Sequence, residues 1–276
     1  MRFAKMHGAG NDFVVLPDME DRFALDAGLV RALCRPHHGL GADGVIRLAA
    51  PHDGARADVF MDYRNADGNV AEMCGNGVRC VAKYVIDHGL LAGPEVLIDT
   101  RGGVKAVTVT DATGGRVRQV RVDMGAPVVG KIDWLLEGGP RGVRVTTLSM
   151  GNPHAVILVD DVDEAPVAEL GSALQAHPAF PDGANVEFIQ VGRRNRLRGR
   201  IWERGVGETL ASGTGASAMA AAAHLLGLAD RELTVVLPGG ELRTAWTETT
   251  LFVTGPAVEV ASGELDEDWL DGMLPA

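Results

Sequence analysis

Cysteine is scarce in this sequence, with three residues among 276, at positions 34, 74 and 80. So few thiols exclude the disulfide framework of a small secreted domain and suit a reducing compartment. A chain of this length can bury a sizeable core without covalent staples, and at roughly 150 residues per domain it has room for two domains. Because no disulfide is expected, a cysteine thiol is available for chemistry.

Positive charge and long apolar runs are also in short supply. The chain has 26 Lys and Arg against 37 Asp and Glu, a formal net charge of −11. Nucleic-acid surfaces need Lys and Arg to neutralise phosphates, so nucleic acid is not an expected partner. The N-terminal stretch lacks the apolar core of a signal peptide, and no run approaches the roughly 20 residues of a membrane span. We expect a soluble, cytoplasmic protein without a membrane partner.

Motifs for metals and dinucleotides are missing as well. Neither HExxH nor CxxC occurs, and the adjacent His37 and His38 face different directions on most backbones. Residues 39–44 fit G-x-G-x-x-G, but a strand-like stretch follows where a helix is required. Residues 213–218 fit the variant ending in Ala, yet they follow a polar segment rather than an apolar strand. We therefore expect neither a metal nor NAD.

Glycine, in contrast, is abundant: 36 of 276 residues, about twice the average usage of ~7%. Strand-like stretches dominate the chain, and several alternate apolar and polar residues, as residues 117–122 do. Helical patterns are fewer and cover residues 25–34, 77–88, 165–175 and 215–226. This balance predicts a mixed α+β fold rather than a strictly alternating parallel one.

An internal repeat organises these elements. The first copy contains Gly10-Asn11-Asp12, Gly41-Ala42-Asp43, Cys74-Gly75-Asn76-Gly77 and Gly89; the second contains Gly151-Asn152-Pro153, Gly183-Ala184-Asn185, Ser212-Gly213-Thr214-Gly215 and Gly227. The intervals are 31, 33 and 15 residues in the first copy and 32, 29 and 15 in the second. We expect two homologous halves, residues 1–114 and 115–263, joined near residues 112–116, with a tail of about residues 264–276 packing on the first half.

Each half places one tetrapeptide at the start of its longest helix. Glycines let a ligand approach the backbone, and the unpaired N–H groups of a helix start favour an anion. The same field lowers the pKa of a thiol, which would make Cys74 a usable thiolate. Two such sites could grip one small carboxylate. The alternative is a pair of ordinary glycine-rich turns capped by side chains, and the duplication argues against it.

These residues resemble the diaminopimelate epimerase family. The resemblance is carried by Lys5 to Phe13, by Asn65 to Gly68 leading to Met73 to Cys80, by Gly151 to His154, by Asn185 and by Glu203 to Thr209, in the family's order. It implies a cofactor-independent isomerase of lysine and peptidoglycan biosynthesis, which interconverts LL- and meso-diaminopimelate and forms a homodimer. It also implies two pseudo-symmetric domains, each a curved, mostly antiparallel sheet around a central helix, with the substrate between them and one base on each of its faces.

The resemblance assigns roles residue by residue. Cys74 is one base, and the α-carboxylate is held by Gly75, Asn76, Gly213 and Thr214. Glu203, supported by His154, holds the α-ammonium, while the distal end is held by Asn11, Asn65, Asn152, Asn185 and Arg204. Duller interpretations stay open: turn asparagines, a surface ion pair of Glu203 and Arg204, and a buried structural histidine. Cys80 is expected in the core, and Cys34 has no assigned role.

Two positions depart from the family pattern. Ser212 stands where the family has its second cysteine, and a serine hydroxyl without an activating histidine is a poor base near neutral pH. Activity is therefore expected to be impaired, whether the serine is natural or introduced. Gly44 stands where many relatives place a glutamine that contacts the distal end of the substrate. Two alternatives follow: a one-base isomerase, racemase or dehydratase of another amino acid, and a catalytically silent amino-acid-binding protein.

Overall fold

The computed structural model describes residues 1–52, 54–137 and 142–272. They form two units: Met1–Val122 together with the chain from Pro256 onward, and Asp123–Gly255. The division falls at residues 122/123 rather than at 114/115, because residues 112–116 are the tip of a hairpin between β6 (Lys105–Thr113) and β7 (Arg116–Asp123). The chain returns at residue 256 rather than 264, because β18 (Val258–Glu264) pairs with β1 (Arg2–Gly8).

The strands of the first unit form one sheet in the order β18-β1-β2-β3-β4-β5-β6-β7. The strands not yet given bounds are β2 (Asn11–Pro17), β3 (Gly44–Ala49), β4 (Val59–Asn65) and β5 (Glu95–Asp99). Helix α1 (Ala27–Cys34) connects β2 to β3, and α2 (Gly75–Asp87) connects β4 to β5. Both connections join parallel neighbours, which need a crossover of this kind.

The second unit has its own sheet, in the order β10-β11-β12-β13-β15-β16-β17. These strands are β10 (Val143–Ser149), β11 (Pro153–Leu158), β12 (Asn185–Arg193), β13 (Arg196–Glu203), β15 (Glu232–Leu237), β16 (Gly240–Trp246) and β17 (Leu251–Pro256). Short strands β8 (Val128–Val129) and β9 (Trp134–Leu136) pair with β10, and β14 (Gly207–Thr209) pairs with β13.

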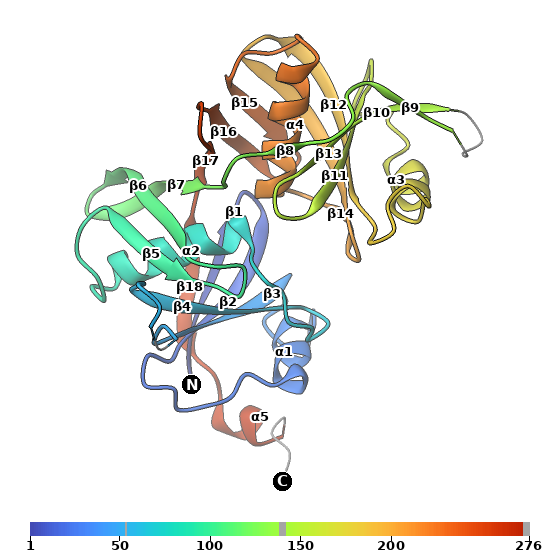
Figure 1. Ribbon diagram of the computed structural model, residues 1–276. Coiled ribbons are helices and arrows are strands. Elements are labelled where there is room, and N and C mark those ends of the chain that lie inside the picture. The colour runs from blue at the N-terminus through green and yellow to red at the C-terminus, as the bar shows by residue number, and fades with distance from the viewer. Residues whose placement is uncertain (53, 138–141, 273–276) are drawn as a thin grey trace. The chain divides into compact units, whose positions relative to one another are not determined.

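The two sheets repeat one topology, as Figure 1 shows for each unit separately. From β1 to β7, successive neighbours are antiparallel, parallel, antiparallel, parallel, antiparallel and antiparallel. The second unit has the same series from β10 to β17, with α3 (Val167–Gln175) and α4 (Gly213–Leu225) at its two parallel crossovers. The expected α+β class, with pseudo-symmetric, mostly antiparallel halves, is confirmed.

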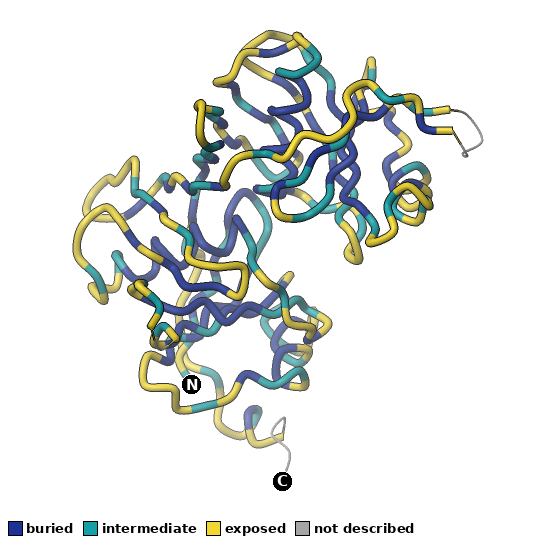
Figure 2. The backbone as a smooth tube through the Cα atoms, in the orientation of Figure 1, coloured by how far each residue is buried: buried dark blue, intermediate teal, exposed yellow. Residues whose placement is uncertain are grey.

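A buried helix lies at the centre of each unit. Every residue of α2 from Gly75 to Val85 is buried, and α4 is buried along most of its alanine-rich length (Figure 2). Each helix is therefore enclosed by its own unit, and the polar side chains that α2 carries are buried with it. Both helices start two residues earlier than expected, because the side chains of Cys74 and Ser212 cap them.

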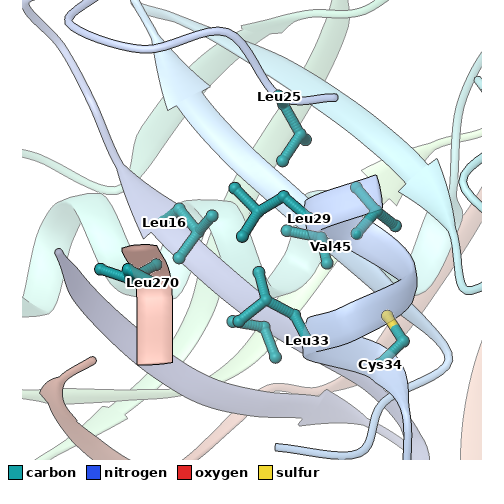
Figure 3. Close-up of a cluster of buried hydrophobic side chains, with 9 residues drawn as sticks. Leu16, Leu25, Leu29, Leu33, Cys34, Val45 and Leu270 are labelled. Carbon is teal, nitrogen blue, oxygen red and sulfur yellow. The ribbon is translucent and has the colours of Figure 1, made fainter. Parts of the chain in front are cut away.

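The outer face of the first sheet carries a separate apolar cluster. Leu29 and Leu33 of α1 pack there with Leu16 and Val45 from β2 and β3 (Figure 3). Leu270, from the C-terminal helix α5 (Glu267–Asp271), joins the same cluster, so the tail packs on the first unit. Helix α1 begins after Asp26, whose carboxylate accepts the N–H groups of Gly28 and Leu29, and this cap moves the start from residue 25 to 27.

Candidate active site

Cys74 occupies the N-cap position of α2 with an extended backbone, φ −137° and ψ 116°. Its Sγ accepts the N–H of Gly77 at 3.4 Å and lies 3.7 Å from Oδ1 of Asn11. The side chain is half-buried, whereas Cys34 and Cys80 are buried, and burial raises the pKa of each of those two thiols to about 12. Cys74 is therefore the thiol suited to chemistry, and Cys80 is in the core as expected.

Asn76 and Asn11 form a hydrogen-bonded pair beside this thiol. Asn76 is buried, and its Nδ2 donates to Oδ1 of Asn11 at 3.2 Å. The Nδ2 of Asn11 in turn donates to the carboxylate of Asp43 at 2.7 Å. The structure thus brings three of the expected site residues, Cys74, Asn76 and Asn11, into one network on α2 and β2.

Arg79, one turn into α2, is a member of this network that the sequence analysis missed. Its guanidinium is fully buried and donates from Nη2 to Oδ1 of Asn76 at 2.6 Å. It also donates to the carbonyl oxygens of Gly75 and Pro256, each at 3.2 Å. Burial lowers the pKa of this guanidinium, against the influence of the two nearby thiols. The signal in the sequence was an arginine among the apolar residues that follow the motif of Cys74.

Asn65, expected at the distal end of the substrate, lies at the end of β4 opposite Gly44 of β3. A Cβ atom at Gly44 would come within 2.6 Å of both the Tyr63 ring and the Arg64 carbonyl oxygen. A glutamine at position 44 therefore has no room beside Tyr63. The hydroxyl of Tyr63 donates to Oδ1 of Asn65 at 2.8 Å, so Tyr63 fills this corner and orients Asn65.

The second unit repeats the helix start with different chemistry. Ser212 caps α4 with φ −138° and ψ 130°, and its Oγ accepts the N–H of Gly215 at 3.3 Å. The hydroxyl of Thr214 lies 3.4 Å from that of Ser212. Ser217 occupies the position equivalent to Arg79, and its Oγ donates to the carbonyl oxygen of Gly213 at 2.9 Å. The start of α4 at Ser212, Gly213 and Thr214 therefore carries hydroxyl groups, whereas the start of α2 carries a thiol and, one turn on, an arginine.

His154 is buried on β11 within a second polar cluster. Its Nδ1 lies 2.6 Å from Oε1 of Glu187, and its Nε2 lies 2.9 Å from Oδ1 of Asn152, which it meets as a donor. Burial raises the pKa of the Glu187 carboxyl, while His154 opposes this shift. Both ring nitrogens of His154 thus have protein partners, one of them the expected site residue Asn152. Glu187 was not anticipated from the sequence.

Glu203, Arg204 and Asn185 meet at the end of β13. The Oε1 of Glu203 accepts the hydroxyl of Thr209 at 2.5 Å. Asn185, the pairing neighbour of His154 on the parallel strand, accepts the backbone N–H of Arg204 at 2.9 Å and donates to the carbonyl oxygen of Pro153 at 3.1 Å. The guanidinium of Arg204 donates to the carbonyl oxygen of Asp182 at 2.8 Å. Asn185 therefore fixes the loop that carries Arg204.

Groups of His, Cys, Asp and Glu that could hold a metal do not occur among the described residues. Within the same residues, no helix has the length and apolar character to cross a membrane.

Comparison with known proteins places this chain in a family. Residues 3–130 and 146–260 match the family model described as diaminopimelate epimerase. Proteins called diaminopimelate epimerase from Heliobacterium modesticaldum and Moorella thermoacetica are each 45% identical to this chain, over 96% and 97% of it and 99% and 100% of their own lengths.

Two solved structures share the fold. A probable proline racemase from Agrobacterium radiobacter has a TM-score of 0.74 at 20% identity, covering 99% of this chain and 94% of that one. A hydroxyproline epimerase from Agrobacterium vitis has a TM-score of 0.73 at 17% identity, covering 95% and 91%. The chain belongs to the diaminopimelate epimerase family of isomerases.

Proposed function

We propose that this chain epimerises LL-diaminopimelate to meso-diaminopimelate with Cys74 as its one effective base. The observation that carries the proposal is the thiol at the start of a buried helix, half-exposed and joined to Asn11 and Gly77. A helix start stabilises a thiolate, and a thiolate can abstract a proton near neutral pH. We further propose a cytoplasmic homodimer that acts in lysine biosynthesis without pyridoxal phosphate or another cofactor.

The chemical problem is the weak acidity of the α-carbon. A substrate flanked by carboxylate and ammonium groups needs preorganised donors to stabilise the carbanion that forms. We assign this task to the backbone N–H groups of Gly75, Asn76, Gly213 and Thr214, since the N-terminus of a helix favours negative charge. Cys74 removes the proton from one face of the α-carbon, and position 212 serves the other face.

Other residues select and orient the substrate in this proposal. Glu203, already paired with the hydroxyl of Thr209, binds the α-ammonium. Asn11, Asn65 and Asn152 present amides to the distal end, and the guanidinium fork of Arg204 suits the distal carboxylate. The contacts of His154 and Asn185 favour indirect roles: His154 orients Asn152, and Asn185 positions Arg204.

Ser212 sets the limit on the rate. A serine hydroxyl has a pKa far above that of a thiol, so it neither removes nor returns a proton efficiently. We expect the Ser212→Cys variant to epimerise both isomers with kcat about 100-fold or more above the present chain, since general acid–base catalysis contributes about 10² to 10⁴-fold. Ser212→Ala is the matched control and is expected to leave kcat within about twofold, because it removes a hydroxyl that does little chemistry.

Isotope exchange separates this account of Ser212 from the proposed substrate. In D₂O, the present chain is expected to deuterate the α-carbon of the isomer that faces Cys74, and not that of its epimer. Equal and fast deuteration of both isomers would show that Ser212 is a competent base. No exchange and no epimerisation, even with Ser212→Cys, would exclude diaminopimelate as the substrate.

A second candidate is a one-base isomerase or racemase of another amino acid. It is favoured by the corner at Gly44, where Tyr63 occupies the space of the family's glutamine. The same exchange experiment, run on other amino acids, decides between the two candidates. An amino acid that exchanges faster than diaminopimelate supports the second. A ligand that binds without exchange in either variant indicates a silent binding protein.

A further inference from the structure

We propose that Arg79 is a positioning residue for Cys74, placing a buried positive charge beside the thiolate and fixing the amide of Asn76. This inference deepens the proposed function, since it takes Cys74 as the base. Arg79 makes no direct contact with the reacting carbon in this scheme. It acts through the ionisation of Cys74 and through the orientation of its amide neighbours.

The case begins with the cost of burying Arg79. Its side chain has no solvent exposure, and its hydrogen bonds go to three neutral oxygens: two carbonyls and the amide of Asn76. Among the described residues, no carboxylate lies within 4.0 Å of this guanidinium, whereas Arg47 pairs with Asp18 and the buried Lys83 pairs with Asp87. A buried charge without a counter-charge is expensive, so its retention calls for an anion that forms nearby.

Two thiols are close enough to Arg79 to interact with it electrostatically, Cys74 and Cys80. Cys80 is fully buried, and burial raises its pKa to about 12, so it remains a thiol at neutral pH. Cys74 lies at the helix start, where the N–H of Gly77 already faces its sulfur. A nearby cation favours the charged form of a thiol. Cys74 is therefore the anion that Arg79 supports.

The hydrogen-bonded chain through Asn76 has one possible direction. A guanidinium can only donate, so Asn76 turns Oδ1 toward Arg79 and Nδ2 toward Asn11. At the other end the carboxylate of Asp43 can only accept, so Asn11 turns Nδ2 toward it. Oδ1 of Asn11 is thereby presented to the sulfur of Cys74 at 3.7 Å. Asn11 stabilises the thiol and Arg79 the thiolate, which suits a group that takes up and releases a proton.

The fold makes room for this arginine at Gly8 of the first unit. A Cβ atom on Gly8 of β1 would lie 2.9 Å from Nη2 of Arg79 and 3.1 Å from the carbonyl oxygen of Asn76. In the second unit the equivalent position is Ser217, which also donates to the carbonyl of the first helical residue but carries no charge. The two base positions are therefore electrostatically unequal.

Other ionisable groups around this end of α2 come mostly in opposed pairs. Lys5 of β1 pairs with Asp12 of β2, and the carboxylate of Asp43 accepts from the N–H of Asp12 and from Asn11. His7 of β1 accepts the N–H of Gly10, and Lys83 pairs with Asp87 within α2. Among the described residues, Arg79 is fully buried and pairs with no carboxylate; Arg64 of β4 also pairs with none, but its side chain is only half-buried and donates to the carbonyl oxygen of Gly68. Removing Arg79 should change Cys74 more than removing any of the others.

The test is the pH dependence of alkylation of Cys74 by iodoacetamide, without substrate, with the modified peptide identified by mass spectrometry. Cys34 and Cys80 stay silent because their thiols are buried and have pKa values of about 12. We expect Arg79→Met to slow alkylation about 10-fold at pH 7 and to move the profile up by about one pH unit, with an unchanged rate on the alkaline plateau. Arg79→Lys, which keeps the charge, is expected to stay within about threefold of the parent.

Two further variants keep the outcome decisive. Lys83→Met removes a paired cation from the same helix and is expected to change the alkylation rate less than twofold. Gly8→Ala keeps the charge but displaces the guanidinium, and it is expected to shift the profile in the same direction as Arg79→Met, which matters if the latter does not fold. Circular dichroism and thermal unfolding verify the fold of each variant.

A pH profile of alkylation that is unmoved in Arg79→Met, or moved equally in Arg79→Lys, overturns the proposal. Neither result depends on whether diaminopimelate is the substrate.

Discussion

Cys74 and Ser212 stand at the same backbone position in the two units. Their φ angles are −137° and −138°, and their ψ angles are 116° and 130°. Each side chain accepts the N–H of the residue three positions later, at 3.4 Å for Cys74 and 3.3 Å for Ser212. The starts of α2 and α4 thus differ in the chemistry of the capping side chain rather than in backbone conformation. A cysteine at position 212 would therefore have nearly the same backbone conformation as Cys74 has in the first unit.

Tyr63→Phe is expected to weaken substrate binding through Asn65. The change deletes the hydroxyl that holds Oδ1 of Asn65 at 2.8 Å and keeps the ring that fills the space beside Gly44. A hydrogen bond of this kind contributes about 1 kcal/mol, so we expect KM to rise about fivefold with little change in kcat. Steady-state kinetics in the Ser212→Cys background measure both constants.

The other tyrosine supplies the control for that experiment. Tyr84 stacks on His88 near the end of α2, far along the helix from Cys74. Tyr84→Phe is expected to leave KM unchanged. A fivefold rise in KM for both variants, or for neither, would contradict the role given to Tyr63.

Thiol counting distinguishes Cys74 from the two buried cysteines. Cys34 lies in the apolar cluster beneath α1, Cys80 is inside α2, and the pKa of each is about 12. We expect one thiol per chain to react rapidly with Ellman's reagent in the native protein at pH 8, and three in denaturant. The Cys74→Ser variant should show no rapid reaction. Fast reaction of Cys34 or Cys80 in that variant would mean that one of the two buried sites opens readily.

Asp18 should make the stability of the first unit depend on acid pH. Burial alone would raise the pKa of this carboxyl, but the N–H groups of Arg22 and Phe23 and the guanidinium of Arg47 outweigh it and hold the pKa below 3.8. The unfolded chain therefore binds this proton more readily than the folded chain. The stabilisation is present above about pH 4 and is lost as the pH falls through the lower, folded value.

Urea unfolding at pH 7 and at pH 3 measures this contribution. Asp18→Asn is expected to lower the free energy of unfolding by about 1–3 kcal/mol at pH 7 and by less at pH 3, because at pH 3 the carboxyl of the unfolded chain is largely protonated and this favours unfolding. Glu241→Gln is a control, since Glu241 pairs with Arg196 at an exposed site where such pairs contribute little. A loss that is equal at both pH values would argue against an ionised Asp18 as the cause.

Local patterns predicted the starts of helices α1 to α4 to within two residues, while the short C-terminal helix α5 was not expected. The differences have local causes: Asp26, Cys74 and Ser212 are caps, and capping by a cysteine is not a familiar sequence signal. The domain boundary was harder, because residues 112–116 form a turn that could separate two units or join two strands of one hairpin. Pairing of β6 with β7, a contact between strands, decided it.

The candidate site divides in the same way. The repeat located Cys74, Asn76 and Asn11, because each sits in a glycine-flanked motif that recurs in order. Arg79, Glu187 and Tyr63 were missed, since their importance depends on what they meet. Arg79 is unusual only because Gly8 of β1 leaves room for it, and Tyr63 only because Gly44 of β3 lies against its ring.

The sequence by itself determined the duplication, the place of one thiol at a helix start, the serine at the equivalent position and the family to which the resemblance pointed. These follow from residue types at fixed intervals along one chain. The tertiary structure decided which polar groups come together: His154 with Glu187, Tyr63 with Asn65, and Arg79 with Asn76 and Cys74. The charge and orientation of a side chain depend on burial and on contacts between segments far apart in the chain. A local stretch of sequence contains no information on either the burial or these contacts.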